Sequence, residues 1–564
     1  MAQDPKPANT NGLENIKHVV VLMFENRSFD HLFGDFPNVN GLFDGNGNFK
    51  DDCYNLPNPL EPPSSGNKQC FPSPVDPSAP LKHDFTHDFG DGMMPDLFGP
   101  IFKITGDAPP HPSNSGAIYN SGYTVKGLVG QIEPLPTTYP ATNPGFYTTY
   151  NTCAQQQQSV MSYFTNGTLQ VLHALAQEFV LCDNWHCDMP GHTLPNRAFI
   201  HCGTTCGKDG TTGGIDDMDG GMVNSTSIFD VINQQSGIKQ PPTWAMYAPD
   251  NAYGQPFHLD TKFLNPALQS TPGTPLSQFA TDCTNETLPF YSFIMCWTAN
   301  TDIYTDTSMH PNSMMQGGEN MLAAVYNALR NSNSWKDTLL VVTFDENGGI
   351  YDHVFPPTTT PPDPKAGATP QHTTGCCGND WILNSSFDFS LLGLRVPALF
   401  ISPWLANGID STQYQNTSVL RFLIDMMNAN YGTNASCLTS RDGSAPPLDS
   451  VFSQFGQSTM RTDCPDWMAP YPTLPCNDPA TGSNEVPYSD GTLTQWIPPP
   501  DILSAPPVPY INELLNIYAG PLPGHPDSDQ KITRDFATIG EVNEYVEERQ
   551  QAAEAYWGGK KTGS

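Results

Sequence analysis

The stretch Thr338-Leu-Leu-Val-Val-Thr-Phe344, followed directly by Asp345-Glu346-Asn347-Gly348-Gly349, decides how the chain folds. An unbroken run of apolar and β-branched residues predicts a strand that is buried on both faces, as in parallel sheets. Such a strand places two carboxylates at its C-terminal end, which is where open α/β sheets bind their ligands. Two adjacent oxygen donors at this position predict a site for a divalent cation.

A second stretch, His18-Val-Val-Val-Leu-Met23, has the same character and runs into Phe24-Glu25-Asn26. If the two strands are neighbours in a parallel sheet, their C-terminal ends lie at the same edge. We therefore expect four residues from opposite parts of the chain to hold one divalent metal ion: Glu25, Asn26, Asp345 and Glu346. Their oxygen atoms favour Ca²⁺, Mg²⁺ or Mn²⁺, and Zn²⁺ stays open as an alternative.

Strands and helices alternate along the rest of the chain, which is the pattern of a doubly wound α/β protein. Helices are expected over 169–178, 319–331 and 419–427, and strands over 179–184, 242–247, 290–295 and 395–402. We predict a mostly parallel sheet flanked by helices, with long loop insertions, in a catalytic domain of residues 1–435. Residues 436–564 are rich in proline and are expected to wrap the same domain as extended coil, before a helix over 541–557.

The composition excludes several classes of protein. Acidic residues number 57 against 24 basic ones, a net charge of −33, which disfavours binding to nucleic acid through its phosphates. The same charge is equally consistent with a role in solubility alone. No apolar segment reaches the ~18 residues of a membrane span, so no transmembrane segment is predicted.

The cysteines and sequons favour a secreted or extracellular protein, periplasmic or at the cell surface if the source is bacterial. The 14 cysteines show no zinc signature and predict disulfides instead, among them a bond between Cys53 and Cys70. Sequons for N-glycosylation occur at Asn166, Asn224, Asn285, Asn384, Asn416 and Asn434, although an Asn- and Thr-rich chain also produces them by chance. The N-terminus lacks a signal-peptide core, so we expect a signal peptide to have been removed.

Thr193 lies on a tight turn that begins with Met189-Pro-Gly-His192, just before a candidate helix. Backbone N–H groups at such a position favour a phosphate anion and a developing alkoxide, which makes Thr193 a candidate nucleophile. The alternative is that Thr193 only caps the helix. His83 and His87 are four residues apart and can share a helix face toward a ligand, although such a pair is often incidental.

Four blocks of sequence, taken together and in this order, carry a family resemblance. They are Glu25-Asn-Arg-Ser-Phe-Asp30, Gly191-His-Thr193-Leu-Pro195-Asn196-Arg197, His310-Pro311 and Asp345-Glu346-Asn-Gly-Gly-Ile-Tyr-Asp352-His353. This set resembles the phosphoesterase family of bacterial, fungal and plant non-specific phospholipases C, which also includes certain acid phosphatases. The resemblance implies an alkaline-phosphatase-like α/β fold, one divalent cation and a covalent phospho-enzyme.

Carried over by position, the resemblance implies roles for individual residues. Glu25, Asn26, Asp345 and Glu346 would hold the metal, and Thr193, itself coordinated to it, would be the nucleophile. Coordination would lower the pKa of the Thr193 hydroxyl. His310 would contact the phosphoryl group or protonate the leaving group, and the further catalytic candidates are His83, His87 and His353.

The expected function is a phospholipase C that hydrolyses phosphatidylcholine-type phospholipids to diacylglycerol and a phosphorylated head group. The alternative is a broad-specificity acid phosphatase acting on phosphomonoesters. The Thr-x-Pro-Asn-Arg form of the second block resembles the lipase branch, whereas the acidity of the chain disfavours adsorption to anionic membranes, so membrane contact would be transient. A third hypothesis, a non-catalytic secreted glycoprotein with a structural metal site, leaves Thr193 and His310 without a purpose.

Overall fold

The computed structural model describes residues 12–55, 64, 69–75, 81, 93, 160–205, 226–235, 242–248, 274–296, 306–311, 313–362, 389–466 and 468. Within this part of the chain the central feature is an eight-stranded sheet of order β11-β4-β10-β9-β1-β8-β6-β7. The strands are β1 (His18–Phe24), β4 (Val180–Cys182), β6 (Trp244–Ala248), β7 (Thr274–Pro275), β8 (Tyr291–Met295), β9 (Thr338–Phe344), β10 (Ala398–Ile401) and β11 (Gly408–Asp410).

Strand β1 lies in the middle of the sheet and pairs in parallel with β9 on one side and β8 on the other. The register places Phe24 opposite Phe344, so the residues that follow the two strands leave the sheet at the same edge. Strand β10 is reversed, because it pairs antiparallel with both β9 and β4. The predicted doubly wound, mostly parallel sheet is therefore confirmed, with one antiparallel strand inside it.

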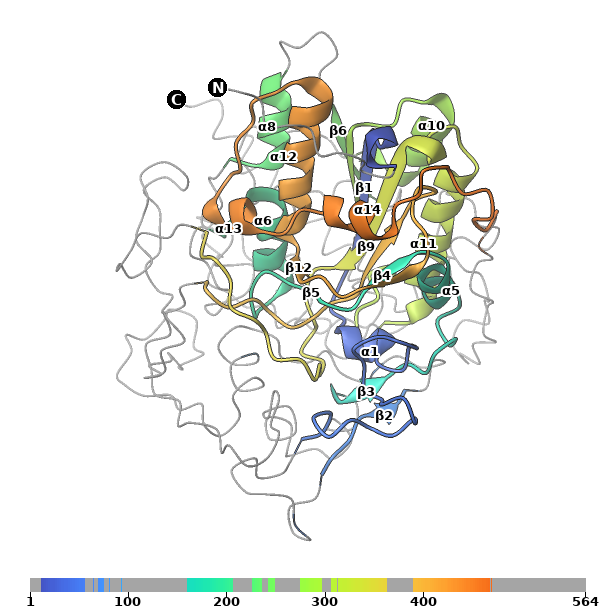
Figure 1. The fold of residues 1–564 in the computed structure, drawn as a ribbon, viewed down its shortest axis with the longest axis vertical. Coiled ribbons are helices and arrows are strands. Elements are labelled where there is room, and N and C mark those ends of the chain that lie inside the picture. Colours follow the sequence, from blue (N-terminus) through green and yellow to red (C-terminus); the bar gives the residue numbers. More distant parts are fainter. Residues whose placement is uncertain are drawn as a thin grey trace, which may run out of the picture.

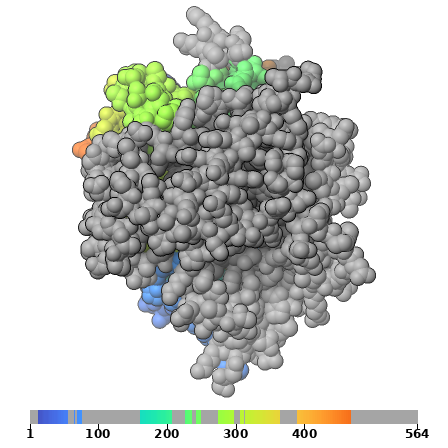
Figure 2. Space-filling view, turned by 180° about the vertical axis from the view of Figure 1, so that it is seen from behind, coloured from blue at the N-terminus to red at the C-terminus, as the bar shows by residue number. Residues whose placement is uncertain are grey.

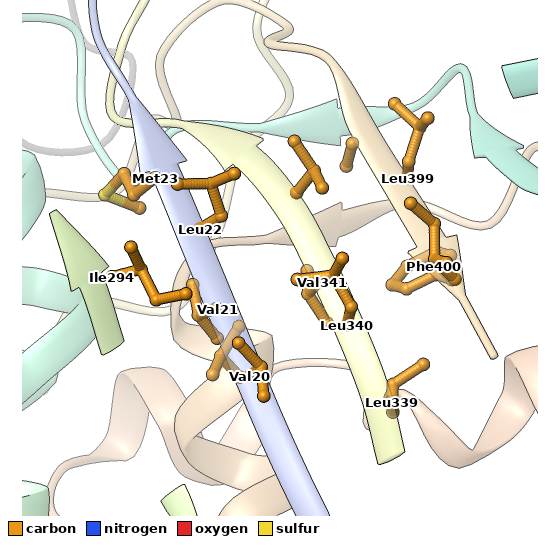
Figure 3. Close-up of a cluster of buried hydrophobic side chains, with 14 of the residues drawn as sticks. Val20, Val21, Leu22, Met23, Ile294, Leu339, Leu340, Val341, Leu399 and Phe400 are labelled. Atoms are coloured by element: carbon orange, nitrogen blue, oxygen red, sulfur yellow. The ribbon is translucent and has the colours of Figure 1, made fainter. Parts of the chain in front are cut away.

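The core of the sheet is built from branched and long apolar side chains. Figure 3 shows side chains of β1, β8, β9 and β10 next to one another, and those of Val21, Leu22, Val341 and Leu399 are fully buried. Because both faces of these strands are covered, the apolar run is continuous rather than alternating. Burial of each such side chain stabilises the fold by about 1.5–3 kcal/mol.

The longer helices form two groups on either side of strands β1 and β9 (Figure 1). In one group α11 (Met315–Arg330) contacts both α5 (Gln170–Glu178) and α10 (Leu276–Asn285). In the other, α6 (Thr193–Cys202) contacts α8 (Ile228–Gln234) and α12 (Thr417–Tyr431), which also contacts α13 (Ser440–Ser444). Figure 2 shows the reverse view, in which described residues appear along the upper edge and near the lower edge.

Short elements complete the part of the chain that the structure describes. They are α1 (Phe29–Phe33), α14 (Asp449–Phe455), the 3-10 helices Leu13–Asn15 and Trp335–Asp337, and the strands β2 (Ser73–Pro74), β3 (Ser162–Tyr163), β5 (Trp185–His186) and β12 (Tyr414–Gln415).

The three predicted helices correspond to α5, α11 and α12, with α11 beginning four residues earlier than expected. The predicted coil after residue 436 is wrong in its described part, because α13 and α14 lie there. A capping box explains α13: the Thr439 hydroxyl accepts a hydrogen bond from the helix, and the Asp442 carboxylate accepts one from the Thr439 backbone N–H. The expected helix over 541–557 lies outside the described residues.

No disulfide joins any two of the nine cysteines that the structure describes, which corrects the predicted bond between Cys53 and Cys70. The Cys53 thiol is buried and donates to Asp52 Oδ1 at 3.6 Å, while Cys70 forms a backbone bridge with Asn55. Apart from the half-buried Cys437, the other described cysteines lie in the core, where burial raises the pKa of thiols such as Cys182 and Cys187.

The sequons differ in accessibility. Asn166, Asn285 and Asn434 are exposed, whereas Asn416 is fully buried and its side-chain oxygen accepts a hydrogen bond from Trp185. Asn416 is therefore not a glycosylation site in the folded protein, and secretion stays a prediction. Among the described residues, none of the helices has the length and hydropathy that crossing a membrane requires.

The free thiols predict the outcome of a titration. Protein denatured without reductant should expose at least the nine described thiols, and among these nine the half-buried Cys70 and Cys437 should react first in the native protein. Buried thiols should react slowly, because their pKa is raised and reagents do not reach them. A reduced, denatured sample with all 14 thiols is the control. A count of four or fewer before reduction would restore the predicted disulfides.

Candidate active site

The ends of β1 and β9 are joined by backbone hydrogen bonds that continue beyond the strands. The Asp345 N–H donates to the Phe24 carbonyl at 3.0 Å, and the Arg27 N–H donates to the Glu346 carbonyl at 3.0 Å. Between them, Asn26 has a φ of 60°, and its N–H donates to Asp345 Oδ1 at 3.1 Å. This left-handed conformation is uncommon for a non-glycine residue and turns the chain sharply at the edge of the sheet.

Gly348 makes this turn sterically feasible. A Cβ atom at residue 348 would lie 2.3 Å from the Asn26 carbonyl oxygen, and its φ of 63° is one that glycine adopts readily. The Gly348 N–H also donates to Glu346 Oε2 at 2.5 Å. The Asp-Glu-Asn-Gly-Gly sequence is therefore needed both for its carboxylates and for the close approach of two backbone segments.

Thr193 is the first residue of helix α6, and its hydroxyl donates a hydrogen bond to Asn26 Oδ1 at 3.2 Å. The preceding turn is held by the Asn196 side chain. Its amide nitrogen donates to the carbonyls of Met189, Gly191 and His192 at 3.1–3.2 Å, and its oxygen accepts from the Met189 N–H. Thr193 is only partly buried, so its hydroxyl is placed beside the strand ends without being sealed from solvent.

Arg197 lies between two of the predicted metal ligands. Its Nη2 donates to Glu25 Oε1 at 2.9 Å and its Nε donates to Asp345 Oδ2 at 3.3 Å. Burial raises the pKa of Asp345, Arg197 opposes this increase and the Glu25 charge adds to it, and together these effects bring the pKa to about 6. Glu25, Asp345 and Glu346 are all buried, and Arg197 pairs with the first two of them, so the buried carboxylates outnumber the guanidinium. This donor set and its excess of negative charge fit a divalent cation.

His310 is held at the same site by its Nδ1 atom. Nδ1 lies 3.0 Å from Glu25 Oε2 and 3.0 Å from Ser308 Oγ, and the residue is buried. Arg27 donates to the carbonyls of His310 and Met309 at 2.8 and 2.6 Å, which fixes the backbone of this loop. Contacts at one ring nitrogen orient an imidazole for chemistry at the other.

A second buried cluster contains His353. Ligand atoms of Asp30, Asp352 and His353 lie within 4.8 Å of one another, a spacing that can hold a metal ion. However, Arg395 Nη2 lies 2.9 Å from Asp30 Oδ1, and its Nε lies 2.9 Å from Asp352 Oδ1. Arg395 supplies one positive charge against the two carboxylates, so the cluster combines an ion-pair network with a spacing that can hold a metal ion.

The structure thus brings together the predicted residues Glu25, Asn26, Thr193, His310 and Asp345, with Glu346 next to Asp345. His353 lies in the network around Arg395, where its Nδ1 is 2.7 Å from Asp30 Oδ2. The roles of all these residues stay predictions. His83 and His87 lie outside the described residues. Arg197 was missed as the charge partner, although its spacing of four residues from Thr193 places both on one face of a helix.

Replacement of Arg197 tests the electrostatic account of the site. Arg197→Ala leaves Glu25 and Asp345 buried without their guanidinium, so the free energy of unfolding should fall by about 3–5 kcal/mol. The control is Lys17→Ala, which removes an ion pair of 2.8 Å between Lys17 and Asp337. Because Lys17 is largely exposed, this replacement should lower the free energy of unfolding by less than about 1 kcal/mol. Urea unfolding in the presence of chelator measures both. Equal losses of unfolding free energy in the two variants would show that Arg197 does not stabilise the buried carboxylates.

The chain is similar to known phosphoesterases. The Phosphoesterase family matches residues 16–429. Non-specific phospholipase C3 of Arabidopsis thaliana is 28% identical over 484 residues, which cover 82% of this chain and 78% of that protein. Non-hemolytic phospholipase C of Burkholderia pseudomallei (strain K96243) is 28% identical over 477 residues, covering 77% and 58%. A Vibrio parahaemolyticus protein of the alkaline phosphatase superfamily aligns with a TM-score of 0.29 and 13% identity over 49% of this chain and 64% of that one. The chain belongs to the phosphoesterase family and is a hydrolase acting on phosphoric ester bonds.

Proposed function

We propose that the chain is a phospholipase C that converts phosphatidylcholine-type phospholipids into diacylglycerol and a phosphorylated head group through a phosphothreonine at Thr193. One observation carries the proposal: a partly exposed threonine hydroxyl at the start of α6 is bonded to Asn26 beside buried carboxylates. The names of relatives such as non-specific phospholipase C3 support the lipid substrate. Neither the names of these relatives nor the site favours the acid phosphatase alternative.

The proposal includes one divalent metal ion held by Glu25, Asn26, Asp345 and Glu346. The buried negative charge of the three carboxylates exceeds what Arg197 supplies, and Asn26 Oδ1 connects these ligands to Thr193. When bound, the ion would stabilise charge on the phosphoryl oxygens and favour ionisation of the threonine hydroxyl.

Thr193, His310 and the start of α6 have different roles in the proposed reaction. Thr193 Oγ1, oriented by Asn26 and partly exposed, loses its proton to solvent and attacks phosphorus while the bond from phosphorus to the diacylglycerol oxygen breaks. His310, held at Nδ1 by Glu25, donates a proton to the departing oxygen. Backbone N–H groups at the start of α6 stabilise the phosphoryl oxygens. Water then hydrolyses the phosphothreonine, which releases the phosphorylated head group and restores Thr193.

A direct comparison of substrates tests the proposed class. Purified protein should turn over phosphatidylcholine in mixed micelles with a kcat/KM at least about tenfold above that for p-nitrophenyl phosphate, since a site built for a diester gains binding from its second substituent. Mass spectrometry should identify diacylglycerol and phosphocholine as the products. A preference for p-nitrophenyl phosphate would instead make the protein a phosphomonoesterase, and release of choline would overturn the proposed bond cleavage.

Replacement of Thr193 tests the covalent route. Thr193→Ala should lower kcat by about three orders of magnitude or more with the fold intact, because the nucleophile is lost while one partly exposed hydroxyl contributes little to stability. Thr193→Ser should keep part of the activity, and Thr165→Ala, at an exposed threonine, is the control. Acid-quench mass spectrometry should detect phosphorylated Thr193 during turnover. Near-normal activity of Thr193→Ala would leave water as the nucleophile.

A further inference from the structure

Asp188, five residues before Thr193, is a fully buried carboxylate at the start of the nucleophile turn. Its Oδ1 accepts hydrogen bonds from the Thr417 hydroxyl at 2.8 Å, from Gln415 Nε2 at 3.1 Å and from Arg441 Nη1 at 3.1 Å. Its Oδ2 accepts from the Thr417 N–H at 2.8 Å. The carboxylate is therefore anchored to the start of α12 and to α13, and none of these contacts involves the proposed metal ligands.

Arg441 connects Asp188 to several other segments of the chain. Its side chain is fully buried, and besides Asp188 Oδ1 it donates to the Asp188 carbonyl at 2.6 Å, to the Thr360 carbonyl at 2.6 Å and to the Phe389 carbonyl. The guanidinium carbon also lies 4.8 Å from the centre of the Phe199 ring, which belongs to α6. A planar group with several fixed donors can hold these partners at once, and a lysine cannot.

The residue before α13 contacts the other end of α6. The Thr439 hydroxyl donates to the Gly203 carbonyl at 3.0 Å, where α6 ends. Short helix α13 therefore braces α6 along its length: at the turn before its start through Asp188, in its middle through Phe199 and at its end through Gly203. Figure 1 shows α13 beside α6 and α12. Residues 439–444 follow the 16–429 range that matches the family.

We propose that Arg441, through its ion pair with Asp188, is a positioning residue that sets the place of Thr193 for reaction. Arg441 acts through the turn: Asp188 fixes where the turn begins, Asn196 ties Met189 to His192, and Thr193 follows at once. The bond from Thr193 to Asn26 joins this turn to the end of β1, so a shift of the turn moves the hydroxyl relative to the strand ends. The inference rests on the proposed role of Thr193.

The test compares Arg441→Lys with a matched arginine away from the site. Arg461 resembles Arg441 in its contacts: it donates to the backbone carbonyls of Glu178 and Leu405, and its guanidinium carbon lies 5.4 Å from the centre of the Phe179 ring. It differs in location, because it lies at the opposite end of the sheet, where β4 begins. Dihexanoylphosphatidylcholine below its micellar concentration serves as a soluble substrate, and the folded fraction of each variant is measured at the assay temperature. Arg441→Lys should lower kcat about a hundredfold with KM changed less than about threefold, since a displacement near 1 Å has this effect. Arg461→Lys should change kcat less than about twofold.

A milder pair of variants applies if Arg441→Lys does not fold. Thr417→Val removes one hydroxyl donor from Asp188 and leaves Arg441 in place, whereas Thr338→Val removes a buried hydroxyl bond to Ser334 at the start of β9. Thr417→Val should lower kcat about tenfold and Thr338→Val less than about twofold. Equal effects within either pair, or a loss of activity that follows the folded fraction alone, would overturn the proposal. Full activity of Thr193→Ala in the same assay would instead refute the proposed nucleophile. The contacts of Arg441 and Asp188 would then have a role in stability alone.

Discussion

Burial of three carboxylates at the ends of two adjacent parallel strands is the constraint on which the rest of the site depends. Removing an ionised carboxylate from water costs several kcal/mol unless charges and hydrogen bonds compensate it. The chain compensates Asp345 with the N–H groups of Asn26 and Glu346 and with Arg197. The left-handed Asn26 and the absence of a side chain at Gly348 follow from this need, because the two strand ends must approach closely enough to share donors.

Three buried arginines organise the strand ends, and their charge balances differ. Arg441 faces one carboxylate, that of Asp188, and Arg395 faces two, those of Asp30 and Asp352, with His353 beside them. Arg197 contacts Glu25 and Asp345 next to a third buried carboxylate, Glu346. Of these networks, the one around Arg197 has the largest surplus of negative charge, and it is also the one that contacts Thr193 through Asn26. The cation that we propose beside Thr193 would compensate this surplus, and the ligand spacing beside His353 can also hold a metal ion.

The sequence predicted the parts of the fold that local pattern determines. The run 338–344 is strand β9 as expected, and polar residues directly after two apolar runs correctly indicated that β1 and β9 are parallel neighbours. The reversed direction of β10 was not predictable, because an apolar run reads the same in either orientation. The disulfide prediction failed for a related reason: a count of cysteines does not show that Cys53 contacts Asp52 and that Cys70 pairs with Asn55.

The partners of the site residues were the least predictable, since each joins segments that are far apart in sequence. Arg197 was within a recognisable block, but its two carboxylate partners depend on the packing of α6 against β1 and β9. No local sequence pattern indicated a role for Arg441, because its partner Asp188 lies more than two hundred residues earlier in the chain. The proposed nucleophile, Thr193, has one described side-chain hydrogen bond, to Asn26, which alone does not fix its position. Our proposal for Arg441 follows from this: the buried groups around the turn would set where the hydroxyl lies, although they are remote from the chemistry.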